Sequence, residues 1–138
     1  MRIDQALLLE LDYADGGNHN KKRPYLIIDI VDNKILLLNI SSVRGKEYKL
    51  GFASNKNIKK YKPPLIKLSF VKLDALYIIE NNTNLQEFVL CNGRGMNPIE
   101  LQEIKTAFYE FRENHKINES NIDIKYLMNM NAKNENAI

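Results

Sequence analysis

Residues 25–40 read YLIIDIVDNKILLLNI, which is two apolar runs on either side of the dipeptide Asp32-Asn33. Runs of this length and composition, bounded by turn residues, are typical of strands. Asp and Asn tolerate the positive φ of a two-residue turn, so the segment predicts a tight antiparallel hairpin. The remaining elements are expected to pack around this hairpin.

Shorter apolar segments on both sides of the hairpin predict further strands. Leu7, Leu9 and Leu11 recur with a period of two, as in a half-buried strand. Residues 48–52 show a weaker alternation of the same kind, with Tyr48 and Phe52 on one face. The other expected strands cover residues 65–73, 76–79 and 88–90, which makes about six short strands in all.

One helix is expected, and it begins at Asn97. Asn97 is the cap, Pro98 takes the first helical position, and Glu100 completes a capping box. The helix should run to about Asn114, with one apolar stripe formed by Leu101, Ile104, Phe108 and Phe111. Many short strands with local connections and one closing helix predict a mainly β fold, either a small antiparallel barrel or a strongly coiled sheet.

The length of 138 residues predicts one compact domain, which we expect over residues 1–115. Residues 116–138 are rich in Asn and Lys. Ile122, Tyr126 and Met130 recur there at helical spacing behind a possible cap at Ser120 or Asn121, so this segment is either a peripheral tail or a short docked helix.

The absence of long apolar segments and the cysteine content predict a cytoplasmic protein. No segment approaches the roughly 18 consecutive apolar residues that a transmembrane helix needs. The single cysteine, Cys91, excludes a scaffold built on internal disulfides, as small secreted proteins have. We therefore expect no membrane partner.

The charged residues are strongly segregated along the chain. The net charge is only +3, which by itself argues against a nucleic-acid-binding protein. Residues 21–72, however, hold thirteen bases and three acids, a net +10, whereas residues 1–20 carry −3 and residues 73–138 carry −4. The local potential of a surface governs the attraction of charged ligands, so the middle of the chain is the relevant part.

The bases of this middle part gather in three expected loops at residues 21–23, 44–49 and 56–62, with two tyrosines between them. Lysine and arginine contact phosphates, and tyrosine stacks on unpaired bases, so these loops predict single-stranded nucleic-acid binding. The alternative is that the Lys-rich loops are only solvated. The candidate RNA-binding residues are Lys21, Lys22, Ser42, Arg44, Lys46, Tyr48, Lys56, Lys59, Lys60 and Tyr61.

Arg23 and Ser41 are the candidate catalytic pair. Pro24 holds Arg23 in an extended conformation, and Ser41 ends the second strand of the hairpin, so the two residues should meet at its open end. A guanidinium with a neighbouring hydroxyl can bind a phosphate and stabilise the additional negative charge of a pentacovalent transition state. The alternative is a surface ion pair beside a polar strand end.

Metal-dependent hydrolysis has little support in the sequence. The only histidines are His19 and His115, and neither belongs to a motif with metal-ligand spacing. A nuclease built on this chain should therefore act without a metal or other cofactor. His19 precedes Arg23 in an expected loop and is a candidate base, whereas His115 is expected to contact carbonyls of the last helical turn.

The order of several motifs resembles the MazF/PemK family of toxin endoribonucleases. They are Gly16-Gly17, the run Lys22-Arg23-Pro24-Tyr25-Leu26-Ile27-Ile28, then Asn39-Ile40-Ser41-Ser42, then Ser69-Phe70-Val71-Lys72-Leu73-Asp74, and a closing helix. The similarity spans roughly residues 5–112, and the segment from Gly16 to Pro24 is its most specific part. It implies an SH3-like barrel, related in fold to the gyrase poison CcdB.

The resemblance also implies an activity and partners. The family's catalytic arginine corresponds to Arg23 and its catalytic threonine to Ser41, which keeps the hydroxyl. Such toxins cleave single-stranded RNA without a metal and leave 2′,3′-cyclic phosphate and 5′-OH ends. A homodimer and a cognate antitoxin are implied, the antitoxin being a protein or, as in type III systems on the same fold, an RNA. A noncatalytic toxin that binds a protein target is the alternative.

Overall fold

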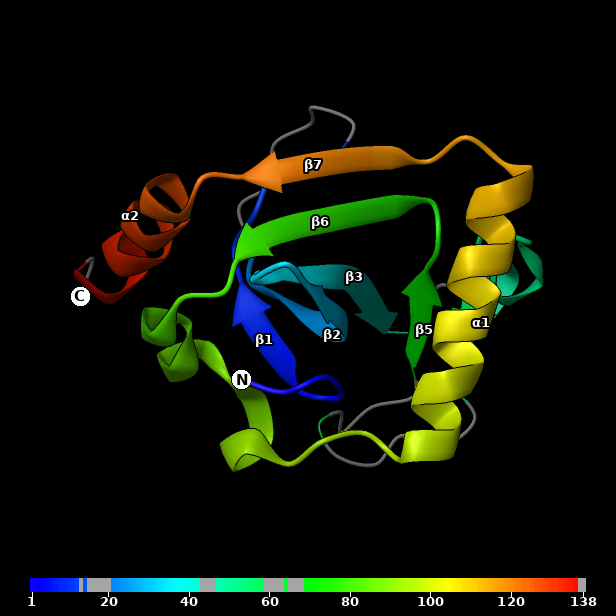
Figure 1. Ribbon diagram of the computed structural model, residues 1–138, viewed down its shortest axis with the longest axis horizontal. Coiled ribbons are helices and arrows are strands. Elements are labelled where there is room, and N and C mark those ends of the chain that lie inside the picture. The colour runs from blue at the N-terminus through cyan, green and yellow to red at the C-terminus, as the bar shows by residue number, and fades with distance from the viewer. Residues whose placement is uncertain (13, 15–20, 43–46, 59–63, 65–68, 137–138) are drawn as a thin grey trace.

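Seven strands form the centre of the protein in the computed structural model, which describes residues 1–12, 14, 21–42, 47–58, 64 and 69–136 (Figure 1). The fold is mainly antiparallel β, as the sequence predicts. The strands are β1 (Ala6–Leu9), β2 (Arg23–Val31), β3 (Lys34–Ser42), β4 (Asn55–Asn57), β5 (Ser69–Lys72), β6 (Ala75–Glu80) and β7 (Asn118–Ile122). The helices are η1 (Glu47–Gly51), η2 (Thr83–Phe88) and η3 (Leu90–Gly93), all 3₁₀, and α1 (Pro98–Asn114) and α2 (Ile124–Asn136).

The expected hairpin is confirmed as β2 and β3. Asp32 and Asn33 form its turn with φ values of 50° and 62°, which these residue types tolerate. The two strands pair antiparallel from Val31↔Lys34 to Tyr25↔Asn39, with a bulge between Ile27 and Asp29. A bulge bends a strand, so the long hairpin can belong to a curved sheet.

Strand β3 pairs with different strands along its length, and these pairings position β5 and β6. Its first half pairs with β6, and its last three residues, Ile40 to Ser42, pair with β5. The chain turns a corner between β5 and β6, which Figure 1 shows clearly. β4 adds to the outer side of β5, so β4 and β5 gather at the end of β3 where Ser41 lies.

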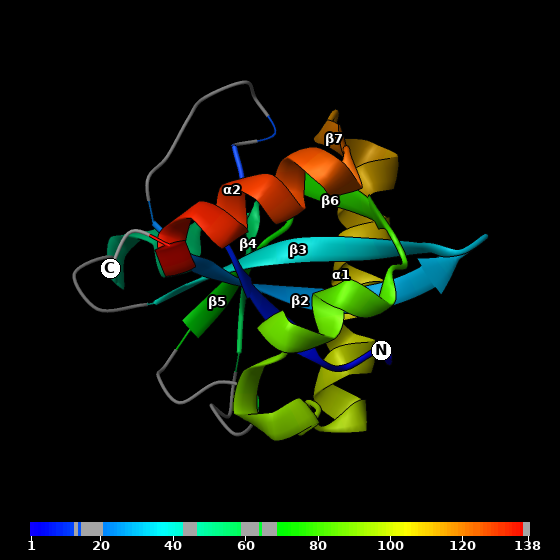
Figure 2. The ribbon, with the colours of Figure 1, turned by 90° about the vertical axis from the view of Figure 1, so that its left-hand side faces the viewer.

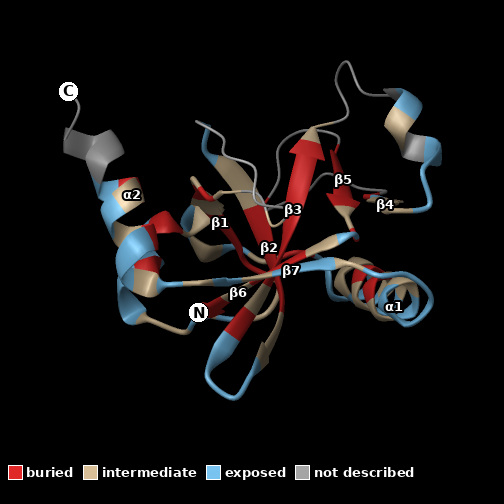
Figure 3. Cartoon of the chain, turned by 90° about the horizontal axis from the view of Figure 1, so that it is seen from above, coloured by how far each residue is buried: buried red, intermediate tan, exposed pale blue. Residues whose placement is uncertain are grey.

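Two hydrophobic clusters lie on the two faces of the bent sheet. Leu7, Leu9 and Leu11 are buried in the first cluster, which confirms their alternation, and Leu127 of α2 packs with them. The second cluster joins β-strand residues to Ile104 and Phe108 of α1. Figure 3 shows α1 and α2 on opposite sides of the sheet, so each helix covers one face.

The sequence predicts both ends of α1 correctly. Asn97 Oδ1 accepts hydrogen bonds from the backbone N–H groups of Ile99 (2.9 Å) and Glu100 (3.2 Å). At the other end, His115 Nδ1 lies 3.2 Å from the carbonyl oxygen of Phe111, as expected for a histidine near the last turn. Tyr109 O–H donates to Asp29 Oδ2 (3.0 Å) and fastens the helix to β2; burial and this hydrogen bond raise the pKa of Tyr109.

Removing the cap should destabilise the protein. Asn97→Ala leaves two backbone donors of α1 without their side-chain acceptor, and we expect the free energy of unfolding to fall by about 1 kcal/mol in urea denaturation. The control is Asn129→Ala at an exposed position of α2, which should be neutral or slightly stabilising because alanine favours helices. Equal losses in the two variants would contradict the capping role.

Two expected strands are wrong, one from a short apolar alternation at residues 48–52 and one from a short apolar run at residues 88–90. Residues 48–52 lie in and just after η1, with Tyr48 68% and Phe52 49% exposed; their rings contact each other edge to face at 6.1 Å. Residues 88–90 make only one isolated bridge, between Leu7 and Val89. Phe88 instead ends η2, a turn that buries it with Leu85. Of the expected strand at 65–73, the described part forms β5.

The C-terminal segment contains a helix, but its details differ from the expectation. Ser120 and Asn121 are not caps, because they lie in β7, which runs parallel to β6. Asp123 caps α2 by accepting a hydrogen bond from the Tyr126 backbone N–H (3.0 Å). Leu127 carries the buried contact, whereas Tyr126 is 52% exposed. Thus residues 118–136 add one strand to the sheet and one helix to its face.

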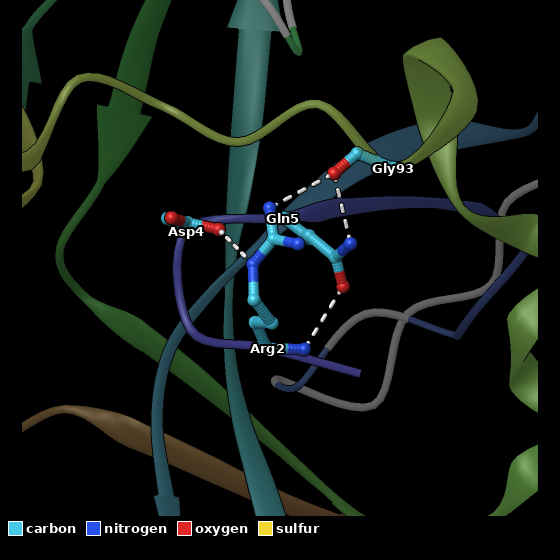
Figure 4. Close-up of polar contacts among 4 residues, drawn as sticks. All are labelled: Arg2, Asp4, Gln5 and Gly93. Atoms are coloured by element: carbon cyan, nitrogen blue, oxygen red, sulfur yellow. Dashed lines mark hydrogen bonds and ion pairs between the residues drawn. The ribbon is translucent and has the colours of Figure 1, made fainter.

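The N-terminal residues are fastened to η3 by a small polar cluster (Figure 4). Arg2 Nη2 and Gln5 Nε2 both donate to the Gly93 carbonyl oxygen, at 3.1 and 2.9 Å. A Cβ at Gly95 would clash with the Asp4 carboxylate, so a larger residue there would require the Asp4 side chain to move. These contacts hold the start of β1 against the segment that leads into α1.

Within the described residues, no helix has the length and apolar character to cross a membrane.

Candidate functional site

The open end of the β2–β3 hairpin carries Arg23 and Ser41. The last pair of the ladder is Tyr25↔Asn39, and Arg23 and Ser41 lie two residues further on in each strand. Side chains two residues apart in a strand share a face, so both residues point to the same side of the sheet as that pair. The ladder between β2 and β3 ends before Arg23 and Ser41, so these two residues are not paired with each other. Beyond that pair, Arg23 faces Leu9 of β1, and Ser41 faces Phe70 of β5.

Arg23 and Ser41 differ in exposure. Arg23 is half-buried, and its Nε is buried without a hydrogen-bond partner among the described residues. Ser41 is only 1% exposed. Lys21 and Lys22 precede Arg23 and are both exposed, so three cations follow one another at this edge. An anion approaching from solvent can therefore reach these cations, whereas Ser41 is shielded from solvent.

The other candidate RNA-binding residues fall into two groups. Ser42 is half-buried and pairs with Ser69, and Tyr48 is exposed on η1, where Lys49 Nζ lies 5.9 Å from its ring centre. Lys56 is half-buried in β4 and not in a loop, because it pairs with Val71 of β5. The second group, Arg44, Lys46, Lys59, Lys60 and Tyr61, lies outside the described residues, as does the candidate base His19.

A polar pocket of about 270 Å³ opens beside this end of the hairpin. Its wall comes from β3, from η1 and β4, from the corner between β5 and β6, and from β7. Two lysines and one aspartate line it together with uncharged polar groups. The lining residues are Ala14, Asn39, Lys49, Phe52, Ser54, Asn55, Lys72, Asp74, Ala75, Tyr77 and Asn118.

Hydrogen bonds that involve backbone groups hold together the segments around the pocket. Asn55 Nδ2 donates to the Lys49 carbonyl oxygen (2.9 Å), which holds η1 against β4. The Leu73 backbone N–H donates to the Ser54 carbonyl oxygen (2.7 Å) and joins β4 to the corner before β6. The Tyr77 hydroxyl accepts from the Ala14 backbone N–H (3.2 Å). The wall is therefore tied together by hydrogen bonds at three places.

Asn39 is the unusual group in this pocket. Its side chain is 3% exposed, and both its Nδ2 and its Oδ1 are buried without a hydrogen-bond partner among the described residues. Asn131, the other buried asparagine among the described residues, is different: it bonds both the N–H and the carbonyl of Glu10 and the Leu127 carbonyl oxygen, at 2.9, 3.2 and 2.9 Å. An unpaired buried amide costs about 1–3 kcal/mol, so Asn39 is not explained by stability.

Sequence reasoning did not select Asn39, Lys49 or Lys72 individually. The available signal for Asn39 was a polar residue inside an apolar run, Leu37-Leu38-Asn39-Ile40, at a position that the hairpin register buries. Lys49 and Lys72 were only two of thirteen bases in the positive segment. Their convergence on one pocket depends on η1 and on the corner between β5 and β6.

Among the described residues, neither a cluster of potential metal ligands nor Cys91 forms part of this site. In the part of the chain that the structure describes, no group of three or more His, Cys, Asp or Glu side chains could hold a metal ion. Cys91 lies in η3 and is half-buried, and its Sγ donates to the Pro64 carbonyl oxygen at 3.2 Å. The chemistry available here is that of cations, amides and hydroxyls.

Neither a protein-family model nor a curated protein sequence matches this chain. A function therefore has to be argued from the geometry of the residues above. Those residues are a half-buried arginine at a strand end, exposed lysines next to it, and a polar pocket beside them.

Proposed function

We propose that the chain is a toxin endoribonuclease of the MazF/PemK kind, with an SH3-like barrel, that cleaves single-stranded RNA without a metal. The observation that carries the proposal is the β2–β3 hairpin, whose ladder ends at Tyr25↔Asn39 and leaves Arg23 and Ser41 two residues beyond that pair, at the open end. The same pair, in the same order, is what the motif resemblance implies.

The chemistry at Arg23 would be electrostatic. In the proposed reaction the 2′-hydroxyl oxygen of the RNA attacks the adjacent phosphorus and loses its proton, and the bond from phosphorus to the 5′-oxygen breaks. The products are a 2′,3′-cyclic phosphate and a 5′-hydroxyl, so the leaving oxygen takes up a proton. Negative charge builds on the non-bridging oxygens in the transition state, where a guanidinium fork stabilises it. An arginine stays protonated at neutral pH, so Arg23 is not the base.

Ser41 and His19 have separate parts in this proposal. Ser41 lies beneath the surface and would support the guanidinium or accept a hydrogen bond from it, which is a positioning role. His19, which precedes Arg23 in the sequence, remains the candidate base.

The exposed cations next to Arg23 and the exposed aromatic ring on η1 suit a single strand. Lys21 and Lys22 can contact phosphates on one side, and η1 offers the exposed ring of Tyr48 with Lys49 beside it. Aromatic faces bind unpaired bases by stacking, and lysines bind the backbone. We extend the proposal to a cytoplasmic homodimer that is held inactive by a cognate antitoxin, either protein or RNA.

A noncatalytic toxin that binds a protein target is the second candidate. A groove of about 610 Å³ beside Lys56 of β4 and the start of α1 favours it, since the apolar residues Pro98, Ile99 and Ala107 line it and Ile99 is 72% exposed. The other lining residues are Gln102, Glu103, Thr106 and Glu110. A groove with exposed apolar side chains suits a protein surface better than a phosphate backbone.

The decisive experiment is RNA cleavage in excess EDTA. The purified chain should cut an end-labelled single-stranded RNA and leave 2′,3′-cyclic phosphate ends. Such ends resist enzymatic polyadenylate tailing and ligation, because both reactions require a free 3′-hydroxyl. Double-stranded RNA of the same sequence should be cut far more slowly, because its bases cannot stack on protein side chains. Complete dependence on Mg²⁺, or no cleavage of any RNA, would overturn the proposal, and the second result would favour the protein-binding toxin.

A further inference from the structure

The pocket that contains Asn39 has the composition of a base-reading site. Asn39 presents one acceptor and two donors in a plane, all buried and none bonded within the described residues. We propose that this pocket binds the base of one unpaired RNA nucleotide beside Arg23. The inference rests on the proposed function in taking RNA as the ligand.

The carboxamide of Asn39 suits the edge of a base. Nucleobases carry a donor next to an acceptor on their edges, and a side-chain amide can bond both at once, as in the frequent pairing of asparagine with adenine. Lysines alone would bind any phosphate without reading the base. The buried amide therefore adds selection among bases to a site that is otherwise cationic.

The remaining wall of the pocket can hold the rest of a nucleotide. Lys49 and Lys72 supply positive charge for a phosphate, and Asp74 can accept a hydrogen bond from a ribose hydroxyl or an amino group. Phe52 is 49% exposed and offers an apolar surface for the base. A volume of about 270 Å³ is near the lower end of ligand pockets, so it suits one nucleotide and not a longer segment.

The position of the pocket links it to the proposed cleavage site. Asn39 and Ser41 are two residues apart on the same face of β3, which corresponds to about 7 Å along a strand. A base held at Asn39 and a phosphate held at Arg23 would thus belong to the same or to neighbouring nucleotides. Base selection in the pocket would decide which phosphate is presented for cleavage.

The first test is nucleotide binding to the unmodified full-length chain, followed by NMR. The four ribonucleoside 5′-monophosphates are titrated separately, and inorganic phosphate is the control. We expect the side-chain NH₂ resonances of Asn39 to shift with at least one nucleotide and not with phosphate. The proposal is overturned if the Asn39 resonances shift with none of the four nucleotides. An equal shift with inorganic phosphate would also overturn it, because the pocket would then bind anions without reading the base.

The second test compares two buried asparagines by substitution. Asn39→Leu keeps the size of the side chain and removes its polar atoms. We expect a melting temperature that is unchanged or higher, because no protein hydrogen bond is lost. Asn131→Leu removes three hydrogen bonds and should lower the melting temperature. A strong destabilisation by Asn39→Leu would show a structural role for Asn39 and contradict the inference.

The cut sites of the variants complete the test. Sequencing the ends of a long RNA after digestion should show a base preference at one position for the wild type, and Asn39→Leu should weaken it by about tenfold or more. Asn131→Leu should keep the preference. If Asn39→Leu cuts RNA with the wild-type base preference, the pocket does not select the base, and the proposed function remains in place. If the wild type cuts no RNA but a nucleotide still shifts Asn39, the pocket stands and the nuclease does not.

Discussion

Arg23→Ala is expected to slow RNA cleavage in EDTA by about 100- to 1000-fold, measured as a single-turnover rate on end-labelled RNA. The Arg23 guanidinium is a half-buried positive charge at the open end of the hairpin, whereas the neighbouring Lys21 and Lys22 are exposed. Its Nε is already buried without a partner among the described residues, so its desolvation is in place before a phosphate binds. Removing it withdraws charge stabilisation from the transition state, whereas the strand pairing of residue 23 with Leu9 uses backbone groups and remains.

The matched control for this variant is Lys22→Ala. Lys22 is the adjacent residue, carries the same charge and is exposed, so its loss should weaken RNA binding by only a few-fold. Arg23→Lys should recover part of the rate at most, because an ammonium lacks the planar fork of the guanidinium. Cleavage by Arg23→Ala at the wild-type rate, with a folded protein, would show that the proposed site is wrong.

Phe108→Ala is expected to remove about 3–5 kcal/mol from the free energy of unfolding. Phe108 is fully buried in the second hydrophobic cluster, and its ring contacts Tyr109 edge to face at 5.2 Å. Domains of this size have a total stability of about 5–15 kcal/mol, so a large share would be lost. The measurement is urea denaturation followed by circular dichroism.

Ile99→Ala in the same helix is the control for Phe108→Ala. Ile99 is 72% exposed, so truncating it removes little buried surface and should change the free energy of unfolding by less than about 0.5 kcal/mol. A similar loss in both variants would contradict the assignment of Phe108 and Ile104 as the contact by which α1 packs on the sheet.

The parts of the fold that could be predicted depend on local interactions. The β2–β3 hairpin follows from two apolar runs around a turn that Asp32 and Asn33 can form by themselves. The start of α1 follows from the cap at Asn97, whose side chain bonds backbone groups two and three residues away. Such patterns can be recognised in the sequence because the interacting groups are close along the chain.

The parts that could not be predicted depend on distant contacts. Residues 48–52 alternate like a strand, but they form most of η1 and the residue after it, with Tyr48 and Phe52 exposed. β7 has the sequence NESNI, which carries little strand signal, and it forms because its backbone pairs with β6. In both places, the local pattern did not decide the secondary structure.

The candidate site divides in the same way. The sequence by itself determined the hairpin, because the turn at Asp32 and Asn33 sets its first pairs. The bulge between Ile27 and Asp29, which the sequence did not predict, then shifts the register by one residue and brings Tyr25 opposite Asn39. Only the tertiary structure decided that β3 passes from β6 to β5 and that η1 and β4 close around Asn39. That pocket joins residues from 14 to 118, so its physical basis is packing between segments that no local pattern connects.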